Sequence, residues 1–119
     1  LYAPSVVALS KTLALWIIKH PVEIAERTFT ALSGVSQAWS IALGAPKSSG
    51  GYPALYAAAN ISGLGYFRSD DQGKTWVKIN DAQHGFGAIS GNPITADPRK
   101  YGRVYVVGGG RGVFYGDIA

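Results

Sequence analysis

From Gly34 onward the chain consists of short apolar or alternating runs separated by clusters of turn-forming residues. Alternation over about four to eight residues indicates half-buried strands, and the glycines between the runs permit the positive φ values that tight hairpins need. Short links between strands indicate antiparallel pairing and an all-β fold. The pattern predicts strands at Gln37–Leu43, Ala54–Asn60, Gly65–Ser69, Thr75–Ile79, Asn92–Ala96, Arg103–Val107 and Gly112–Tyr115.

The N-terminal part follows a different pattern, because all sixteen glycines lie at Gly34 or later. From Thr12 to Phe29 the composition tolerates a helix, which Pro21 should stop or kink. We therefore expect an atypical segment over residues 1–27, in which a helix is allowed, followed by the strands of residues 28–119.

An internal repeat relates the two halves of the chain. Arg27–Leu32 aligns with Lys74–Ile79 at an offset of 47 residues, Thr28 falling on Thr75. Four-stranded propeller blades recur at about 40–50 residues. The chain then contains one four-stranded unit and a second unit of three strands, whose fourth strand would come from elsewhere in a parent chain and remove an exposed edge.

The most specific motif is Ser69-Asp70-Asp71-Gln72-Gly73-Lys74-Thr75-Trp76, which fits S-x-D-x-G-x-T-W. Side-chain oxygens can accept backbone N–H bonds across such a turn, Gly73 permits a positive φ, and Trp76 can pack over the hairpin. This structural interpretation competes with a catalytic carboxylate pair and is favoured, because side-chain-to-backbone bonds explain the residue types. The structural residues are Ser69, Asp71, Gly73, Thr75 and Trp76.

The motif is that of the Asp-box, or BNR repeat, and the chain resembles the C-terminal portion of glycoside hydrolase family 74. These are secreted xyloglucan-active β-1,4-glucanases built from two seven-bladed propellers. The resemblance implies a partial β-propeller of about two antiparallel blades, with both catalytic aspartates earlier in the parent chain. It is carried by Gln37–Ile41, Tyr52–Tyr56, Phe67–Asp71, Trp76–Asp81, Gln83–His84, Ile94–Arg99, Tyr101–Tyr105, Gly110–Gly112 and Tyr115–Asp117.

Residues 1–27 depart from the family pattern, because Val22–Glu26 stands where a preceding Asp-box is expected. We interpret this segment as mispredicted, frameshifted or unrelated to the propeller. No basic start or cleavage site marks a signal peptide in the chain, and no apolar run reaches the ~20 residues of a membrane span. An extracellular location is expected for the parent protein by resemblance.

Composition excludes several classes of site. The chain has no cysteine and two histidines, so no metal site is expected, and no cofactor. The net charge is +4, but the cations are dispersed, which argues against a nucleic-acid partner. The glycine-rich run from Gly108 to Gly112 joins two predicted strands and does not open a helix, so a phosphate loop is not expected.

The Asp81–Gly87 loop links the outer strand of one unit to the inner strand of the next, on the side opposite the Ser69–Trp76 turn. Gln83, His84 and Phe86 are residue types that bind sugars, and we predict them to bind substrate. The alternative is that His84 bonds within its own loop and Phe86 is buried. Of the remaining acids, Asp81 and Asp117 have no partner that the sequence identifies, and no catalytic residue is assigned.

The expected function is that of a C-terminal fragment of a secreted endo-β-1,4-glucanase hydrolysing xyloglucan, inactive by itself. Its partners would be xyloglucan or a related β-glucan and the remaining blades. One alternative is a non-catalytic Asp-box propeller that binds carbohydrate or protein. Another is a sialidase-type hydrolase, which would need an arginine cluster for an acidic sugar, and the matching strings contain none.

Overall fold

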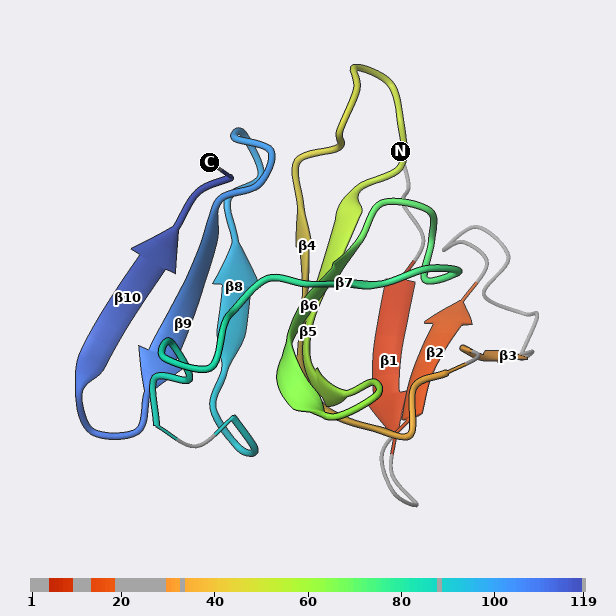
Figure 1. The fold of residues 1–119 in the computed structure, drawn as a ribbon. Coiled ribbons are helices and arrows are strands. Elements are labelled where there is room, and N and C mark those ends of the chain that lie inside the picture. Colours follow the sequence, from red (N-terminus) through yellow and green to blue (C-terminus); the bar gives the residue numbers. More distant parts are fainter. Residues whose placement is uncertain (1–4, 10–13, 19–29, 33, 88, 119) are drawn as a thin grey trace.

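The computed structural model describes residues 5–9, 14–18, 30–32, 34–87 and 89–118. Within these ranges every regular element is a β-strand, which confirms the all-β prediction (Figure 1). The strands form three antiparallel sheets, ordered β1-β2-β3, β4-β5-β6-β7 and β10-β9-β8. Their bounds are β1 Ser5–Leu9, β2 Ala14–Ile18, β3 Thr30–Ala31, β4 Gln37–Gly44, β5 Ala54–Asn60, β6 Leu64–Ser69, β7 Val77–Lys78, β8 Ile94–Ala96, β9 Val104–Gly108 and β10 Gly112–Gly116.

Every strand predicted after Gly34 is present, and two are shorter than predicted. β7 begins only at Val77, because the backbone N–H of Thr75 donates to the Asp71 carboxylate at 2.8 Å instead of joining a ladder. β8 begins after Pro93, which has no N–H to donate. Side-chain and proline chemistry therefore set these strand ends.

The N-terminal sheet differs from the sequence-based expectation. Ala14–Ile18 is a strand paired with both β1 and β3, so the helix allowed there is wrong. A five-residue run rich in Leu, Trp and Ile is compatible with a buried strand as well as with a helix. Pairing with neighbouring strands determines which of the two forms. The sheet repeats the pairing order of β5-β6-β7. Residues 19–29 lie outside the described residues, and the boundary between 27 and 28 stays a prediction.

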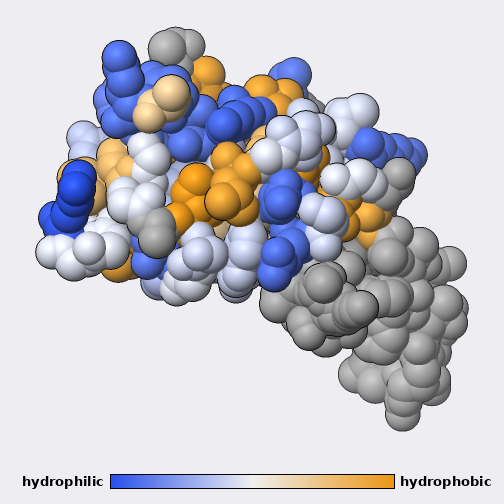
Figure 2. All heavy atoms as spheres, turned by 60° about the horizontal axis from the view of Figure 1, so that its bottom comes forward, coloured by the Kyte–Doolittle hydropathy of each residue, from blue (hydrophilic) through white to orange (hydrophobic). Residues whose placement is uncertain are grey.

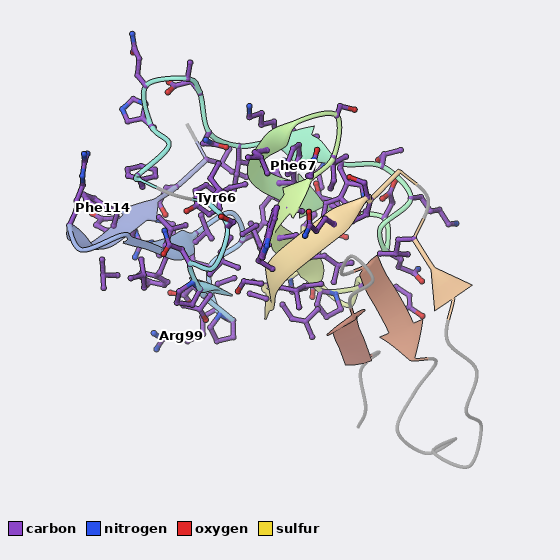
Figure 3. All side chains as sticks on the ribbon, turned by 90° about the horizontal axis from the view of Figure 1, so that it is seen from below. Tyr66, Phe67, Arg99 and Phe114 are labelled. Atoms are coloured by element: carbon purple, nitrogen blue, oxygen red, sulfur yellow. The ribbon has the colours of Figure 1, made fainter. Side chains whose placement is uncertain are left out.

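The three sheets lie side by side, with β1–β3 and β10 at opposite ends (Figure 1). Two cores separate them. One lies between the β4–β7 and β8–β10 sheets and includes Tyr56 and Tyr66, each 1% exposed; the other includes Phe67 on the opposite face of β6. Tyr66 and Phe67 accordingly point to opposite sides of the sheet (Figure 3). β5 is buried along six of its seven residues because both of its faces are covered.

Backbone and side-chain hydrogen bonds fix the second sheet against the third. The Ile94 N–H donates to Ser40 Oγ at 3.0 Å, and the buried Gly102 N–H donates to Tyr56 Oη at 3.1 Å. A β-bulge between Ala38 and Ser40 interrupts the β4 register beside the first of these bonds. The relative position of the two sheets is thus set by directional bonds as well as by apolar packing.

Candidate functional site

The turn from Ser69 to Trp76 is closed by side-chain oxygens. Ser69 Oγ accepts the Gly73 N–H at 2.8 Å and donates to Asp71 at 2.8 Å. Asp71 accepts the Thr75 N–H and the Thr75 hydroxyl. Gly73 has φ +88°, and Trp76 packs at the edge of the core that contains Phe67. These hydrogen bonds and the left-handed backbone at Gly73 close the turn.

The two adjacent aspartates of this turn face different partners. Burial raises the pKa of Asp71, but hydrogen bonds from Thr75 and Ser69 outweigh it and lower the pKa to about 2. Asp70 instead accepts a hydrogen bond from Tyr101 at 2.9 Å and contacts Arg68 Nε at 3.3 Å. Asp71 and the Oδ2 atom of Asp70 are therefore held by structural bonds, which argues against a catalytic pair.

The connection from β7 to β8 lies on the other side of the sheets from the Ser69–Trp76 turn (Figure 1). Near the start of this connection, Asp81 accepts the N–H groups of Gln83 and His84 at 2.9 and 2.8 Å. The His84 ring Nδ1 lies 2.6 Å from the same oxygen. The hydrogen bond with His84 holds the pKa of Asp81 below its usual range. The predicted site residues Gln83 and His84 are thus positioned by an aspartate that the sequence left without a partner.

Phe86, the third predicted substrate-binding residue, is less exposed than Gln83 and His84. Its ring is half-buried and lies between Phe114 and Tyr66, with centroid distances of 4.8 and 6.5 Å. Its φ is +52°, a left-handed conformation that is uncommon for an aromatic residue. Such strain persists where surrounding contacts impose it. Phe86 forms the floor between the two sheets, whereas His84 and Gln83 are exposed above it.

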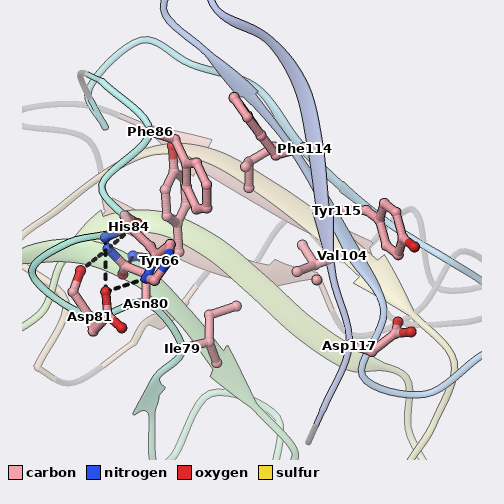
Figure 4. A pocket seen from close by; sticks show the side chains of 12 residues that line it. Tyr66, Ile79, Asn80, Asp81, His84, Phe86, Val104, Phe114, Tyr115 and Asp117 are labelled. Atoms are coloured by element: carbon pink, nitrogen blue, oxygen red, sulfur yellow. Dashed lines mark hydrogen bonds and ion pairs between the residues drawn. The ribbon is translucent and has the colours of Figure 1, made fainter.

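A cleft of about 550 Å³ lies between the outer strands of the second and third sheets (Figure 4). Its apolar floor includes Tyr66, Phe86 and Phe114, and its polar rim includes His84 and Asp117. Clefts of this size and lining are typical of small-molecule sites. Viewed from the side of the β7–β8 connection, apolar surface is flanked by hydrophilic residues (Figure 2). The sequence analysis did not assign Tyr66 and Phe114 to the site, because these two residues come together only when the second and third sheets pack against each other.

The opposite end of this cleft carries an ion-pair cluster. Asp117 accepts two bonds from Arg103, each 2.7 Å, and one from Lys100 at 3.0 Å. The Arg103 guanidinium holds the pKa of Asp117 well below its usual range, and Lys100 adds to the effect. Arg103 also lies 5.0 Å above the Tyr115 ring. The carboxylate at this end of the cleft is therefore held ionised.

Hydrolysis of a glycosidic bond requires a carboxylic acid that keeps its proton until it reaches the leaving group. Within the described ranges the pKa values of Asp71, Asp81, Asp97 and Asp117 are all lowered, that of Asp97 mainly by the Arg99 backbone N–H. Lowered values disfavour the protonated form. These carboxylates suit hydrogen-bond acceptance from hydroxyl groups and backbone, not general acid catalysis.

Metal sites and membrane-spanning helices are both absent from the part of the chain that the structure describes. No group of three or more His, Cys, Asp or Glu side chains there could hold a metal ion. That part also contains no helix long and apolar enough to cross a membrane.

Repeated antiparallel sheets, linked outer strand to inner strand and packed side by side, define a segment of a β-propeller. No family model matches the chain. It is 50% identical over 89 residues to xyloglucanase Xgh74A of Acetivibrio thermocellus, covering 74% of this chain and 10% of that protein. The chain thus spans about a tenth of the length of this curated relative.

Solved structures agree over a larger part of the chain. The GH74 xyloglucanase of Xanthomonas campestris superposes with a TM-score of 0.77 at 35% identity, covering 100% of this chain and 17% of that one. The GH74 enzyme of Niastella koreensis superposes with a TM-score of 0.76 at 32% identity, covering 92% and 16%. The chain belongs to glycoside hydrolase family 74.

Proposed function

We propose that the chain is a propeller segment of an enzyme that hydrolyses β-1,4-glucosidic bonds in xyloglucan. The observation that carries the proposal is its 50% identity over 89 residues to a protein named as a xyloglucanase. Within that enzyme the segment supplies substrate-binding surface, and the catalytic acid and base come from other parts of the longer protein. The lowered carboxyl pKa values described above support this division.

The binding surface in this proposal is the β7–β8 connection. His84 Nδ1 is engaged by Asp81, which leaves Nε2 for a sugar hydroxyl, and the exposed Gln83 amide can both donate and accept. Phe86 supports the connection from below and contacts the other cleft aromatics. The site residues Gln83 and His84 therefore act on substrate directly, and Phe86 acts by holding the loop in place.

Two kinetic experiments test the proposal. The 119-residue chain should release no reducing ends from xyloglucan, whereas a longer protein that contains it should release xyloglucan oligosaccharides. In that longer protein, Gln83→Ala with His84→Ala should raise KM several-fold and leave kcat nearly unchanged. Tyr52→Ala, at an exposed position on the turn side, serves as the control. Unchanged kinetics in the double variant would remove the binding role.

The alternative function is a non-catalytic propeller that binds carbohydrate or protein. It predicts that the longer protein binds xyloglucan without releasing oligosaccharides.

A polymeric substrate of this kind is met outside cells, so we also propose that the longer protein is secreted. Detecting it in culture medium, with a cytosolic enzyme as the lysis control, tests secretion.

A further inference from the structure

The side chain of Asn80 joins strand β6 to the β7–β8 connection. β7 ends at Lys78, and the Ile79 N–H still donates to the Tyr66 carbonyl at 2.8 Å. The Tyr66 N–H donates to Asn80 Oδ1 at 2.8 Å, which takes the place of a strand carbonyl in an antiparallel ladder. The chain therefore leaves the sheet after Ile79 while the Tyr66 N–H remains paired.

The other end of the Asn80 amide holds the connection. Asn80 Nδ2 donates to the His84 carbonyl at 3.1 Å and, over a longer distance of 3.4 Å, to the Asp81 carbonyl. The partners fix the orientation of the amide, because the Tyr66 N–H can only donate and so requires Oδ1 on its side. One half-buried side chain thus links a strand to two carbonyl groups of the connection (Figure 4).

Residues 81–84, which we call the Asp81–His84 turn, need this link to hold their position. Asp81 accepts the His84 N–H at 2.8 Å and lies 2.6 Å from the ring Nδ1, but these bonds are internal to the turn. They fix its shape and not its place on the sheet. Phe86 packs against Phe114 after the turn, and Asn80 bonds to β6 before it. The position of the His84 ring therefore depends on Asn80.

Strand β6 leaves room for this side chain at Gly65. A Cβ at this position would lie 3.2 Å from Asn80 Oδ1, closer than Cβ atoms usually come, and 2.7 Å from Lys78 Cε at the flexible end of that side chain. Gly65 is not among the glycines with positive φ. The absence of a side chain, and not an unusual backbone conformation, is what Gly65 contributes beside Asn80.

We propose that Asn80 is a positioning residue of the substrate-binding surface, which acts through His84 by fixing the Asp81–His84 turn to β6. This role rests on the proposed function, in which Gln83 and His84 bind the polysaccharide. Asparagine suits it because one short amide carries both an acceptor and donors, whereas an ionised aspartate only accepts. Loss of the donor leaves His84 less ordered before substrate binds, which weakens binding and leaves the chemical step unaffected.

Kinetics of the longer protein on xyloglucan test this role. Asn80→Asp keeps an acceptor for the Tyr66 N–H and loses both donations to the turn, so it should raise KM several-fold with kcat nearly unchanged. Asn80→Ala, which introduces no charge, should raise KM as well. Asn60→Asp is the matched control, because Asn60 at the end of β5 accepts the Gly63 N–H through Oδ1 at 3.0 Å and aspartate keeps that acceptor. An unchanged KM in both Asn80 variants, or an equal rise in the control, overturns the proposal.

Hydrogen–deuterium exchange of the longer protein gives a second readout that needs no substrate. The amides of residues 81–87 should exchange several-fold faster in Asn80→Asp than in wild type. Peptides from β5 and β9 should keep their protection, which shows that the variant is folded. Exchange of residues 81–87 at the wild-type rate in both Asn80 variants overturns the proposal even where KM rises.

The Gln83→Ala with His84→Ala variant separates failure of this role from failure of the proposed function. If the double variant raises KM and neither Asn80 variant does, the positioning role is wrong and the binding surface stands. If neither the double variant nor the Asn80 variants raise KM, although exchange of residues 81–87 is faster, the binding surface is wrong and the positioning role falls with it.

Discussion

The Tyr101 hydroxyl donates a hydrogen bond of 2.9 Å to the Asp70 carboxylate, joining the turn before β9 to the turn after β6. The Arg68 guanidinium lies 5.3 Å above the Tyr101 ring and contacts the same carboxylate. Burial raises the pKa of Tyr101, and the hydrogen bond to Asp70 raises it further. The bond between Tyr101 and Asp70 therefore connects the third sheet to the Ser69–Trp76 turn of the second sheet. The hydrogen bonds of Ser69 and Asp71 stay within that turn.

Tyr101→Phe should lower the free energy of unfolding by about 1–2 kcal/mol, because it removes one bond to a partly buried charged group. Urea denaturation at a concentration where the chain is monomeric measures the change. Tyr52→Phe, 50% exposed, is the control and should leave stability unchanged. Equal stability of the two variants would show that the bond between the sheets contributes nothing.

Gly73→Ala should be more destabilising than Gly50→Ala, although both glycines have positive φ, +88° and +78°. The strained backbone costs each variant about 1–2 kcal/mol. A Cβ at Gly73 would also lie 2.6 Å from Leu32 Cδ1, whereas none of the described atoms lies within 4 Å at Gly50. Overpacking adds about 1–3 kcal/mol at Gly73 alone. Paired thermal melts measure the difference, and equal losses would contradict the contact with Leu32.

Asp71→Asn should remove part of the acid dependence of stability. The pKa of Asp71 falls from 3.8 to about 2 in the folded chain, so the ionised group stabilises the fold above pH 3.8, and this contribution is lost as the pH falls through about 2. The stability gap between wild type and Asp71→Asn should be full above pH 3.8 and shrink toward pH 2. Urea titrations at several pH values measure the gap, and a gap that stays constant would contradict the lowered pKa.

Phe86→Gly should be more stable than Phe86→Ala by about 1 kcal/mol, reversing the usual order of these residues. Both variants lose the ring contacts, but only glycine adopts the +52° φ without strain. Phe114, in the regular strand β10, provides the control pair, and there the alanine variant should be the more stable. If alanine is also better at position 86, the left-handed backbone is not strained.

The strands after Gly34 could be predicted because alternation and turn residues are local signals. The first residue of β7 could not be predicted, because it depends on Asp71 binding the Thr75 N–H. Ala14–Ile18 was misjudged because a short apolar run fits a strand and a helix equally well. In the candidate site, the residue types of Gln83 and His84 were visible in the sequence. The pairing of His84 with Asp81 and the conformation of Phe86 come from tertiary contacts that spacing does not reveal.

β5 is built mainly from alanine where both of its faces are covered, with Ala54, Ala57, Ala58 and Ala59 at 0% exposure. Small side chains there let the sheets on either side approach closely. The small volume of the β5 side chains thus allows the neighbouring sheets to pack at their present distance and angle. A larger residue at any of these positions would widen that angle and displace the β7–β8 connection, altering the shape of a distant binding surface without touching it.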